Sequence, residues 1–410
     1  MGGRAPSVAR EAARGSTWWA AAALLFAAAF GTNVSTPLLL IYRDRLDLSP
    51  ATLTAIFGVY ALGLAPSLLF AGPASDRYGR TRVLLPATVL VALASLLFLA
   101  GENSVPLLFA ARFVQGLASG AAFSVGSAWL QDLVGVGHIA AASRRASLAL
   151  TLGFCLGPLT AGLLGEYGPR PLVVPYVVHV ALVAVLLAAA VIVARHGAWA
   201  AGRRGAAGAS LLPRPQLGRA GRRVFGQTLV PTAICVYAFP SVAITVLPLP
   251  HRHLAHAVAF TGVLAAVSLG AGALVQPVVH RLGVRSGPVG AGLGALGYGL
   301  GAVTAVLDTA WLALPAGGLL GAGGGLCLNA GLTLVQQLST PLTRGACNGL
   351  FYAWAYVGFA MPFLCTSFVT IDGLAIPLAV LAAVSAATAA WLLVSPRPFQ
   401  KERAGQDWTA

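Results

Sequence analysis

The chain has 410 residues, of which 58% are hydrophobic and only 9% are charged. One or two soluble domains cannot enclose that much apolar surface, so the composition excludes a soluble enzyme or binding protein and predicts a protein dissolved in a lipid bilayer. The net charge of +15 does not point to nucleic acid, because apolar runs separate the basic residues.

Twelve segments are apolar and long enough to cross the hydrocarbon core, which takes about 20 helical residues. They lie near residues 17–41, 52–74, 83–100, 105–130, 147–165, 171–194, 226–249, 257–279, 287–306, 311–336, 347–370 and 374–394. The first exceeds the apolar region of a cleavable signal, which has about 7–15 residues, so we expect a retained helix. The sequence predicts an all-α membrane protein of twelve transmembrane helices.

Basic residues gather in alternate connections between these segments, beginning with Arg4, Arg10 and Arg14 in the N-terminal tail. The remaining connections keep only Arg43, Arg45, Arg170 and Arg252. By the positive-inside rule the arginine-rich side is cytoplasmic, and an even number of spans places both termini there. The Ala, Gly and Arg bias is typical of a GC-rich bacterial genome, so we expect the inner (cytoplasmic) membrane of a bacterium.

The sequence predicts two pseudo-symmetric six-helix bundles joined by a linker rich in Arg, Gly, Ala and Pro. The predicted parts are a tail (1–16), a bundle (17–194), the basic cytoplasmic linker (195–225), a second bundle (226–394) and a C-terminal tail (395–410). A shift of 204 residues lays His280-Arg281-Leu282-Gly283 over Asp76-Arg77-Tyr78-Gly79. Parallel repeats of this kind place a binding site at their interface near the midplane. We expect the linker to lie against the anionic inner leaflet; a regulatory role is the alternative.

Charge is densest in the segment Gly72-Pro73-Ala74-Ser75-Asp76-Arg77-Tyr78-Gly79-Arg80-Thr81-Arg82. Gly79 permits a tight reversal, and Asp76 can accept hydrogen bonds from Arg77 or Arg80. This spacing resembles the signature loop of the major facilitator superfamily of secondary transporters, except at Thr81, where the family usually has Arg or Lys. The resemblance implies a latch between the two halves. Its expected members are Gly72, Asp76, Arg77, Gly79, Arg80 and Asp132. The alternative is that these charges only mark the inner face.

Arg112 is the only basic residue well inside a predicted span, and Arg112-x-x-Gln115-Gly116 resembles a second motif of the same family. Arg112, Gln115 and Ser119 share one helical face. We expect that face to line a cavity, because a charge facing lipid costs at least about 2.5–3.5 kcal/mol. The alternative is snorkelling, since Arg112 lies roughly 10 Å from the predicted outer end.

The fifth span contains Gly153, Gly157, Pro158 and Gly162, which resemble a family motif associated with exporters that work as antiporters. The glycines allow close helix contact, and the proline bends the helix. Generic membrane packing would explain the small residues but not the added Gly-Pro pair. The motif therefore favours efflux over uptake.

The resemblance implies a cavity lined by helices one, four, seven and ten. The expected substrate contacts are Asn33, Arg112, Gln115, Tyr237, Asn329 and Tyr356. Every carboxylate lies at a predicted helix end, a loop or a tail, so neutral or anionic substrates are favoured over cations. Coupling to protons would then need a boundary acid such as Asp44, Asp47 or Asp132, or a histidine. For His179 a packed neutral imidazole is favoured over a proton relay.

We therefore expect a monomeric exporter of a small organic compound that alternates access and exchanges its substrate for protons. Two alternatives stay open: an importer of a small metabolite, working as symporter or uniporter, and a membrane receptor or scaffold that does not transport. The sequence contains no nucleotide-binding loop and no His, Cys and carboxylate set with metal-ligand spacing. We therefore expect no enzymatic activity, no cofactor and no metal, with the lipid bilayer and the substrate as partners.

Overall fold

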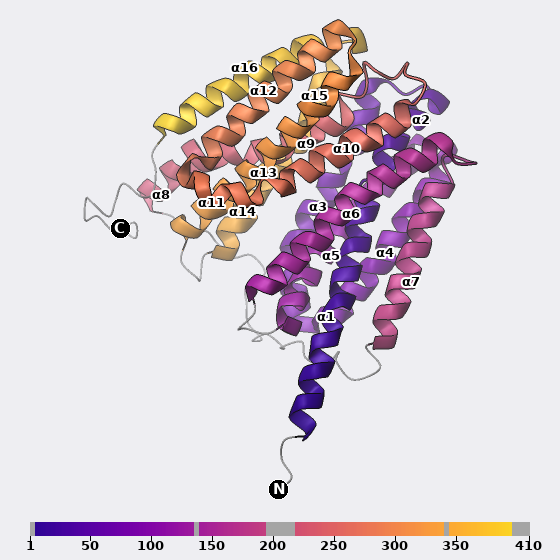
Figure 1. Ribbon diagram of the computed structural model, residues 1–410, viewed down its shortest axis with the longest axis vertical. Coiled ribbons are helices and arrows are strands. Elements are labelled where there is room, and N and C mark those ends of the chain that lie inside the picture. Colours follow the sequence, from indigo (N-terminus) through magenta and orange to yellow (C-terminus); the bar gives the residue numbers. More distant parts are fainter. Residues whose placement is uncertain (1–4, 135–138, 194–217, 340–343, 396–410) are drawn as a thin grey trace. The chain divides into compact units, whose positions relative to one another are not determined.

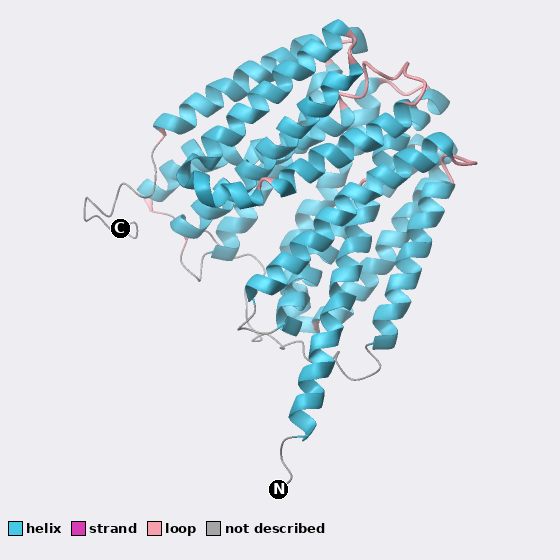
Figure 2. Cartoon of the chain, in the orientation of Figure 1, coloured by secondary structure: helices cyan, strands magenta, loops and turns pink. Residues whose placement is uncertain are grey.

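The computed structural model describes residues 5–134, 139–193, 218–339 and 344–395. These ranges are helical with short connections and contain no strand (Figure 2). Within them, twelve helical segments are long and apolar enough to cross a membrane, as the sequence predicts. Most of the predicted linker and C-terminal tail, and residues 1–4, lie outside the described residues.

The chain separates into two compact units. The first comprises Met1–Asp47 and Val59–Leu211, and the second comprises Leu48–Gly58 and Leu212–Ala410. Helix α3 therefore begins in the second unit and continues into the first, which the sequence did not indicate. The colours of Figure 1 follow the chain from the indigo α1 to the yellow α16.

The helices of the first unit follow one another with short connections. They are α1 (Ala5–Thr32), α2 (Ser35–Leu46), α3 (Pro50–Tyr78), α4 (Arg80–Ala100), the short η1 (Gly101–Asn103), α5 (Val105–Val134), α6 (Ile139–Tyr167) and α7 (Val174–Val193). The first span is thus two helices rather than the single predicted one, because the chain departs from the helix at Asn33 and Val34. We call these two residues the first-span break.

The second unit has more short helical pieces. They are α8 (Arg219–Val224), η5 (Phe225–Leu229), α9 (Val230–Thr245), α10 (Ala257–Leu274), α11 (Gln276–Leu282), η6 (Gly283–Arg285), α12 (Ser286–Leu307), η7 (Ala310–Leu312), α13 (Ala313–Leu338), α14 (Arg344–Val357), η8 (Gly358–Ala360), α15 (Met361–Ser367), η9 (Ile371–Gly373) and α16 (Ala375–Val394). The end of the predicted linker is therefore helical. The eleventh span is divided at Gly358, where a Cβ atom would lie 2.5 Å from the carbonyl oxygen of Ile234.

Glycine allows the helices of the first unit to approach closely. A Cβ atom added at Gly153 would lie 2.6 Å from the Cβ of Ala29, and one added at Gly157 would overlap the carbonyl of Phe30. Helix α6 thus packs against α1 through the two glycines of its exporter-like motif. Pro158 and Gly162 are buried on the same helix.

The connection between α9 and α10 is held at His251, which is buried. Its Nδ1 lies 3.3 Å from Asp308, its Nε2 lies 2.7 Å from the hydroxyl of Thr304, and its ring meets Phe260 edge to face. His253 approaches the second oxygen of Asp308 at 3.3 Å. Burial lowers the pKa of His251 below its ordinary value, while the bond to Asp308 opposes that shift.

We expect Gly157→Ala to destabilise the protein by about 1–3 kcal/mol, the usual cost of overpacking. The reason is that the new methyl group meets backbone atoms of Phe30, which cannot move without shifting α1. The thermal unfolding midpoint in detergent measures the effect. Gly292→Ala is the matched control, because a Cβ there meets nothing within 4 Å. Equal midpoints for the two variants would contradict the close α1–α6 contact.

The protein should lose stability in acid through His251. A depressed pKa means that the folded protein favours the neutral ring. The contribution of His251 to the free energy of unfolding is therefore complete above the ordinary pKa of about 6.5, and it is lost as the pH falls through the pKa of the folded state. The unfolding midpoint should therefore fall less between about pH 7.5 and pH 5 in His251→Gln than in the unchanged protein. An equal fall of the midpoint in His251→Gln and in the unchanged protein would contradict this assignment.

Candidate functional site

Arg112 lies on α5 with only 1% of its surface exposed. One terminal nitrogen donates to the carbonyl oxygen of Thr32 at 2.9 Å, to Ser35 Oγ at 3.3 Å and to Gln115 Oε1 at 2.6 Å. The guanidinium carbon sits 5.1 Å from the ring centre of Tyr60, a cation–π distance. The guanidinium therefore points into the first unit, and the snorkelling alternative is wrong.

Side chains of α5 donate hydrogen bonds to carbonyl groups of α1 whose helical hydrogen bonds are interrupted at the first-span break. Thr36 N–H would bond to Thr32 in a continuous helix, but it bonds instead to Asn33 O at 3.1 Å. Arg112 supplies the missing donor to Thr32. Gly31 O accepts the backbone N–H of Val34 at 3.3 Å, and Gln115 Nε2 adds a second, shorter bond at 2.6 Å. A carbonyl without a donor is costly inside a membrane, so these two side chains make the break tolerable.

The predicted polar face of α5 is present as one cluster. Ser119 lies 3.2 Å from the hydroxyl of Thr32, so Arg112, Gln115 and Ser119 all contact the last turn of α1. Asn33 is buried within the break, and its side-chain oxygen accepts from Thr36 at 3.3 Å. The structure thus brings together the three expected substrate contacts of the first unit: Asn33, Arg112 and Gln115.

His179 on α7 packs against the other side of the same turn. It is fully buried, its Nε2 lies 3.1 Å from Ala27 O, and its Nδ1 lies 2.7 Å from Ser95 Oγ. A carbonyl oxygen only accepts, so Nε2 carries the proton and Nδ1 accepts from the serine, an arrangement that the neutral ring satisfies. A Cβ atom at Gly31 would overlap the imidazole, so glycine is required there.

The charged segment after α3 forms a compact set of ion pairs. Arg80 contacts Asp76 at 2.6 Å and donates from Nε to Asp132 at 2.9 Å, joining the ends of α3, α4 and α5. Arg80 also bonds to Ser75 Oγ at 2.6 Å. Gly79 has φ of 100°, which only glycine adopts readily, and it is the N-cap residue that precedes α4.

Two other expected members of the latch lie apart from these ion pairs. Arg77 is exposed and rests over the neighbouring Tyr78 ring at 5.5 Å. Gly72 faces α5, where a Cβ atom would lie 3.2 Å from Ser124 Oγ. We call Asp76, Arg80 and Asp132 the Arg80 triangle.

In the second unit the expected contacts fall into two places. Tyr237 of α9 stacks on Tyr356 of α14 with ring centres 5.1 Å apart, and Phe359 lies 5.0 Å from Tyr237. Asn329 of α13 instead bonds to Gln276 at the start of α11 and to Gly325 O. A residue four positions before Asn329, Gly325, packs against Gly272 of α10, so Asn329 faces α10 and α11 rather than Tyr237.

Several partners at these sites were absent from the sequence-based prediction. Gly31 and Thr32 act through backbone oxygens, for which the sequence carries no signal. Tyr60 and Phe359 are ordinary aromatic residues of apolar spans, and only their positions make them contacts of Arg112 and Tyr237. Gln276 was detectable in principle, as a polar side chain within an apolar segment.

Solved structures of similar fold are transporters. A POT family transporter in complex with 5-aminolevulinic acid superposes with a TM-score of 0.78 over 93% of this chain and 96% of that one, at 12% identity. A variant of the nucleoside transporter NupG gives 0.71 over 92% and 99%, at 14% identity. At these identities the likeness concerns the fold.

Curated relatives match part of the chain. A bicyclomycin resistance protein homolog of Haemophilus influenzae is 33% identical over 138 residues, which are 34% of this chain and 33% of the relative. The multidrug resistance protein MdtL of Shewanella oneidensis is 37% identical over 125 residues, or 30% of each chain. The matched segments span about a third of these relatives.

One family model covers most of the chain. The model of the Major Facilitator Superfamily matches residues 21–362, which include the first-span break, the Arg80 triangle and the α6 glycines. The chain belongs to the Major Facilitator Superfamily.

Proposed function

We propose that the protein is a monomeric secondary transporter that exports a small neutral or anionic organic compound by alternating access in exchange for protons. The observation that carries the substrate class is the buried guanidinium of Arg112, seven positions inside a span that begins at Val105. Arg stays protonated in proteins, so this part of the first unit is permanently cationic.

The acidic residues support the same substrate class. Among the described residues, the acids within spans lie no more than two positions from a span end: Asp44, Asp76, Glu102, Asp132 and Glu166. A cationic drug near Arg112 would meet like charge in a medium of low dielectric constant, where repulsion is strong. A neutral polar or anionic compound would not.

The proposed direction rests on α6 and on the relatives. Gly153 and Gly157 bring α6 against α1, one turn before the break and beside the Arg112 cluster. The relatives named for multidrug resistance and bicyclomycin resistance support efflux rather than uptake. The positive-inside pattern supports an inner-membrane protein with both termini in the cytoplasm.

Proton exchange is proposed to use an acid at a span end. Asp132 and Asp76 share Arg80, so protonation of either would weaken an ion pair that joins three helices. Asp44 is 78% exposed and pairs with the neighbouring Arg43 on the same helix. Its protonation would therefore weaken a contact that joins no second helix. The neutral packing of His179 makes it a poorer carrier.

Flux in proteoliposomes tests substrate class and coupling together. With an acidic lumen, neutral or anionic compounds should accumulate inside as protons leave, and a permanently cationic dye should not.

The Arg112→Lys variant keeps the positive charge but loses the planar set of N–H donors of the guanidinium. It should lower the flux at least about tenfold, because a hydrogen bond to a charged group is worth about 1.5–3 kcal/mol.

The control for folding is the elution profile of Arg112→Lys on size exclusion. Robust accumulation of the cationic dye would contradict the proposed substrate class. Movement of the substrate in the same direction as the protons would identify an importer. Binding without flux across a broad panel of compounds would identify a receptor or scaffold.

We further expect the Arg80 triangle to favour closure at its own end of the first unit. Asp132→Asn should increase labelling of reporter cysteines at that end by up to about fivefold, the effect of losing an ion pair worth about 0.2–1 kcal/mol. Asp76→Asn should act less, because Asp76 is 52% exposed and Asp132 is 27% exposed. Arg77→Gln removes a charge outside the triangle and should change nothing. Unchanged labelling in Asp132→Asn would remove the latch role.

A further inference from the structure

The seventh span begins with a turn that is wider than an α-helical turn, formed by η5. The backbone N–H of Val230 bonds to Phe225 O, five positions back, rather than to Gly226 O, four positions back. The next residue is Pro231, which has no N–H. Gln227 O therefore lacks the donor that an α-helix would place four positions further along the chain. We call η5 the π-turn.

A side chain from another helix supplies a donor to this carbonyl. The indole Nε1 of Trp391, in the last turn of α16, donates to Gln227 O at 2.7 Å. A carbonyl without a donor is costly where water is scarce, so the indole stabilises the π-turn. The first-span break is stabilised in the same way, by a bond from Arg112 to a carbonyl of α1.

The end of α16 is fixed in the position that this bond requires. Ser395 donates from its backbone N–H and from its hydroxyl to Trp391 O, at 2.9 Å and 2.7 Å. Leu392 is buried, and a Cβ atom added at Gly287 of α12 would lie 3.9 Å from both Leu392 and Thr232. The last turn of α16 therefore packs beside the first turn of α9.

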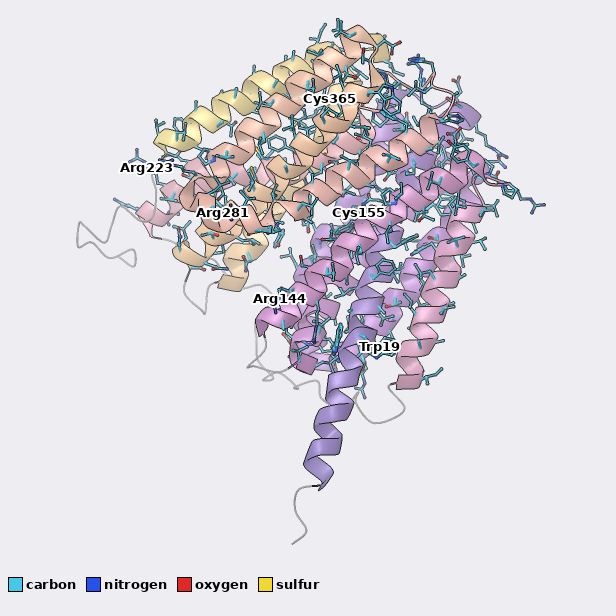
Figure 3. The ribbon with its side chains drawn as sticks, viewed as in Figure 1. Trp19, Arg144, Cys155, Arg223, Arg281 and Cys365 are labelled. Atoms are coloured by element: carbon cyan, nitrogen blue, oxygen red, sulfur yellow. The ribbon has the colours of Figure 1, made fainter. Side chains whose placement is uncertain are left out.

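Gln227 is also held by the residues before the π-turn. Arg223 Nε donates to its side-chain oxygen at 3.3 Å. Figure 3 shows Arg223 near the last turn of α16. The neighbouring Gly226 is exposed, and a Cβ atom there would meet nothing within 4 Å. The bonds to Gln227 are therefore the main contacts that hold this side of the π-turn.

The first unit has neither the proline nor the indole at the matching positions. A shift of 204 residues places Pro231 over Ala27 and Trp391 over Leu187. Helix α1 continues through Ala27 as a regular helix. The proline, the π-turn and the indole donor therefore occur together in the second unit, and all three are missing at the matching positions of the first.

We propose that the π-turn is a hinge of the seventh span, and that the indole of Trp391 is a strap that holds this hinge closed. A π-turn and a proline both interrupt the helical hydrogen bonds, and transmembrane helices bend where those bonds are interrupted. Breaking the bond from Trp391 to Gln227 frees the segment to open. Helix α9 carries Tyr237, so bending at the hinge moves a proposed substrate contact. This last step rests on the proposed function, and the strap does not.

Hydrogen–deuterium exchange of the full chain in detergent tests the strap. Trp391→Phe keeps an aromatic ring but removes the N–H donor, so amide exchange in residues 225–234 should rise about fivefold, the effect of losing one neutral hydrogen bond. Trp311→Phe is the matched control, because Trp311 is an exposed tryptophan of η7, and exchange in residues 225–234 should not change. Unchanged exchange in Trp391→Phe would overturn the proposal.

A second variant separates the hydrogen bond from the packing of the indole ring. Pro231→Ala adds a backbone N–H four positions after Gln227, so this carbonyl no longer needs the indole, and exchange should be slower than in the unchanged protein. In the Pro231→Ala background, Trp391→Phe should change the exchange by less than about twofold, because the two donors serve one acceptor. A rise of the same size in both backgrounds would show that the ring acts by packing, and would overturn the strap.

Flux in proteoliposomes tests the hinge. Pro231→Ala makes the start of the seventh span regular and should lower the flux about fivefold, the factor by which one added hydrogen bond makes opening rarer. Slower exchange with unchanged flux in this variant would overturn the hinge. If the unchanged protein moved no compound, the proposed function would fail instead, and the exchange measurements would still decide whether the strap exists.

Discussion

The first unit depends on the hydrogen bonds that Arg112 and Gln115 of α5 donate to Thr32 and Gly31 of α1. Each side of this interaction would be unfavourable alone. A guanidinium within a span needs acceptors, and carbonyl groups released by a break in a transmembrane helix need donors. Here each group satisfies the other. The buried charge and the broken helix are therefore a single feature of the structure.

This arrangement gives Arg112 a limited capacity for a ligand. One terminal nitrogen already serves Thr32, Ser35 and Gln115. An anionic group that drew this nitrogen away would leave the Thr32 carbonyl without its donor, and the turn before the break would have to move. His179 contacts the opposite side of that turn at Gly31, so movement there would be transmitted to α7 and, through Ser95, to α4. A ligand at the proposed Arg112 site would therefore be coupled through the backbone to the shape of the first span.

The sequence predicted the number of spans and the polar face of α5 because both arise from strong, local signals. Long apolar runs indicate spans, and polar residues at helical spacing indicate a face. The break at Asn33 and Val34 was not predicted, although the sequence carried a signal for it: Pro37 has no N–H to donate to Asn33 O, and its neighbours Asn33, Ser35 and Thr36 are polar. Its stabilisation could not be read from the sequence, because the donors lie some 80 positions away. The separation of Asn329 from Tyr237 was missed for a similar reason. Both lie on spans expected to line a cavity, but only the packing of Gly325 against α10 fixes the direction of Asn329.

The weak sequence repeat shows which structural features the two units share and which belong to the first unit. A shift of 204 residues places Gly283 over Gly79, and both have positive φ, so the tight turn is common to the two units. The same shift places His280, Val284 and Gln336 over Asp76, Arg80 and Asp132. The turn therefore does not need the ion pairs, and the Arg80 triangle belongs to the first unit alone. The first-span break behaves likewise: Ala316 and Leu319 stand where Arg112 and Gln115 would be, and α9 continues without interruption through Tyr237 and Ala238. Where the donors are missing the helix is unbroken, as expected if the donors are what permits the break.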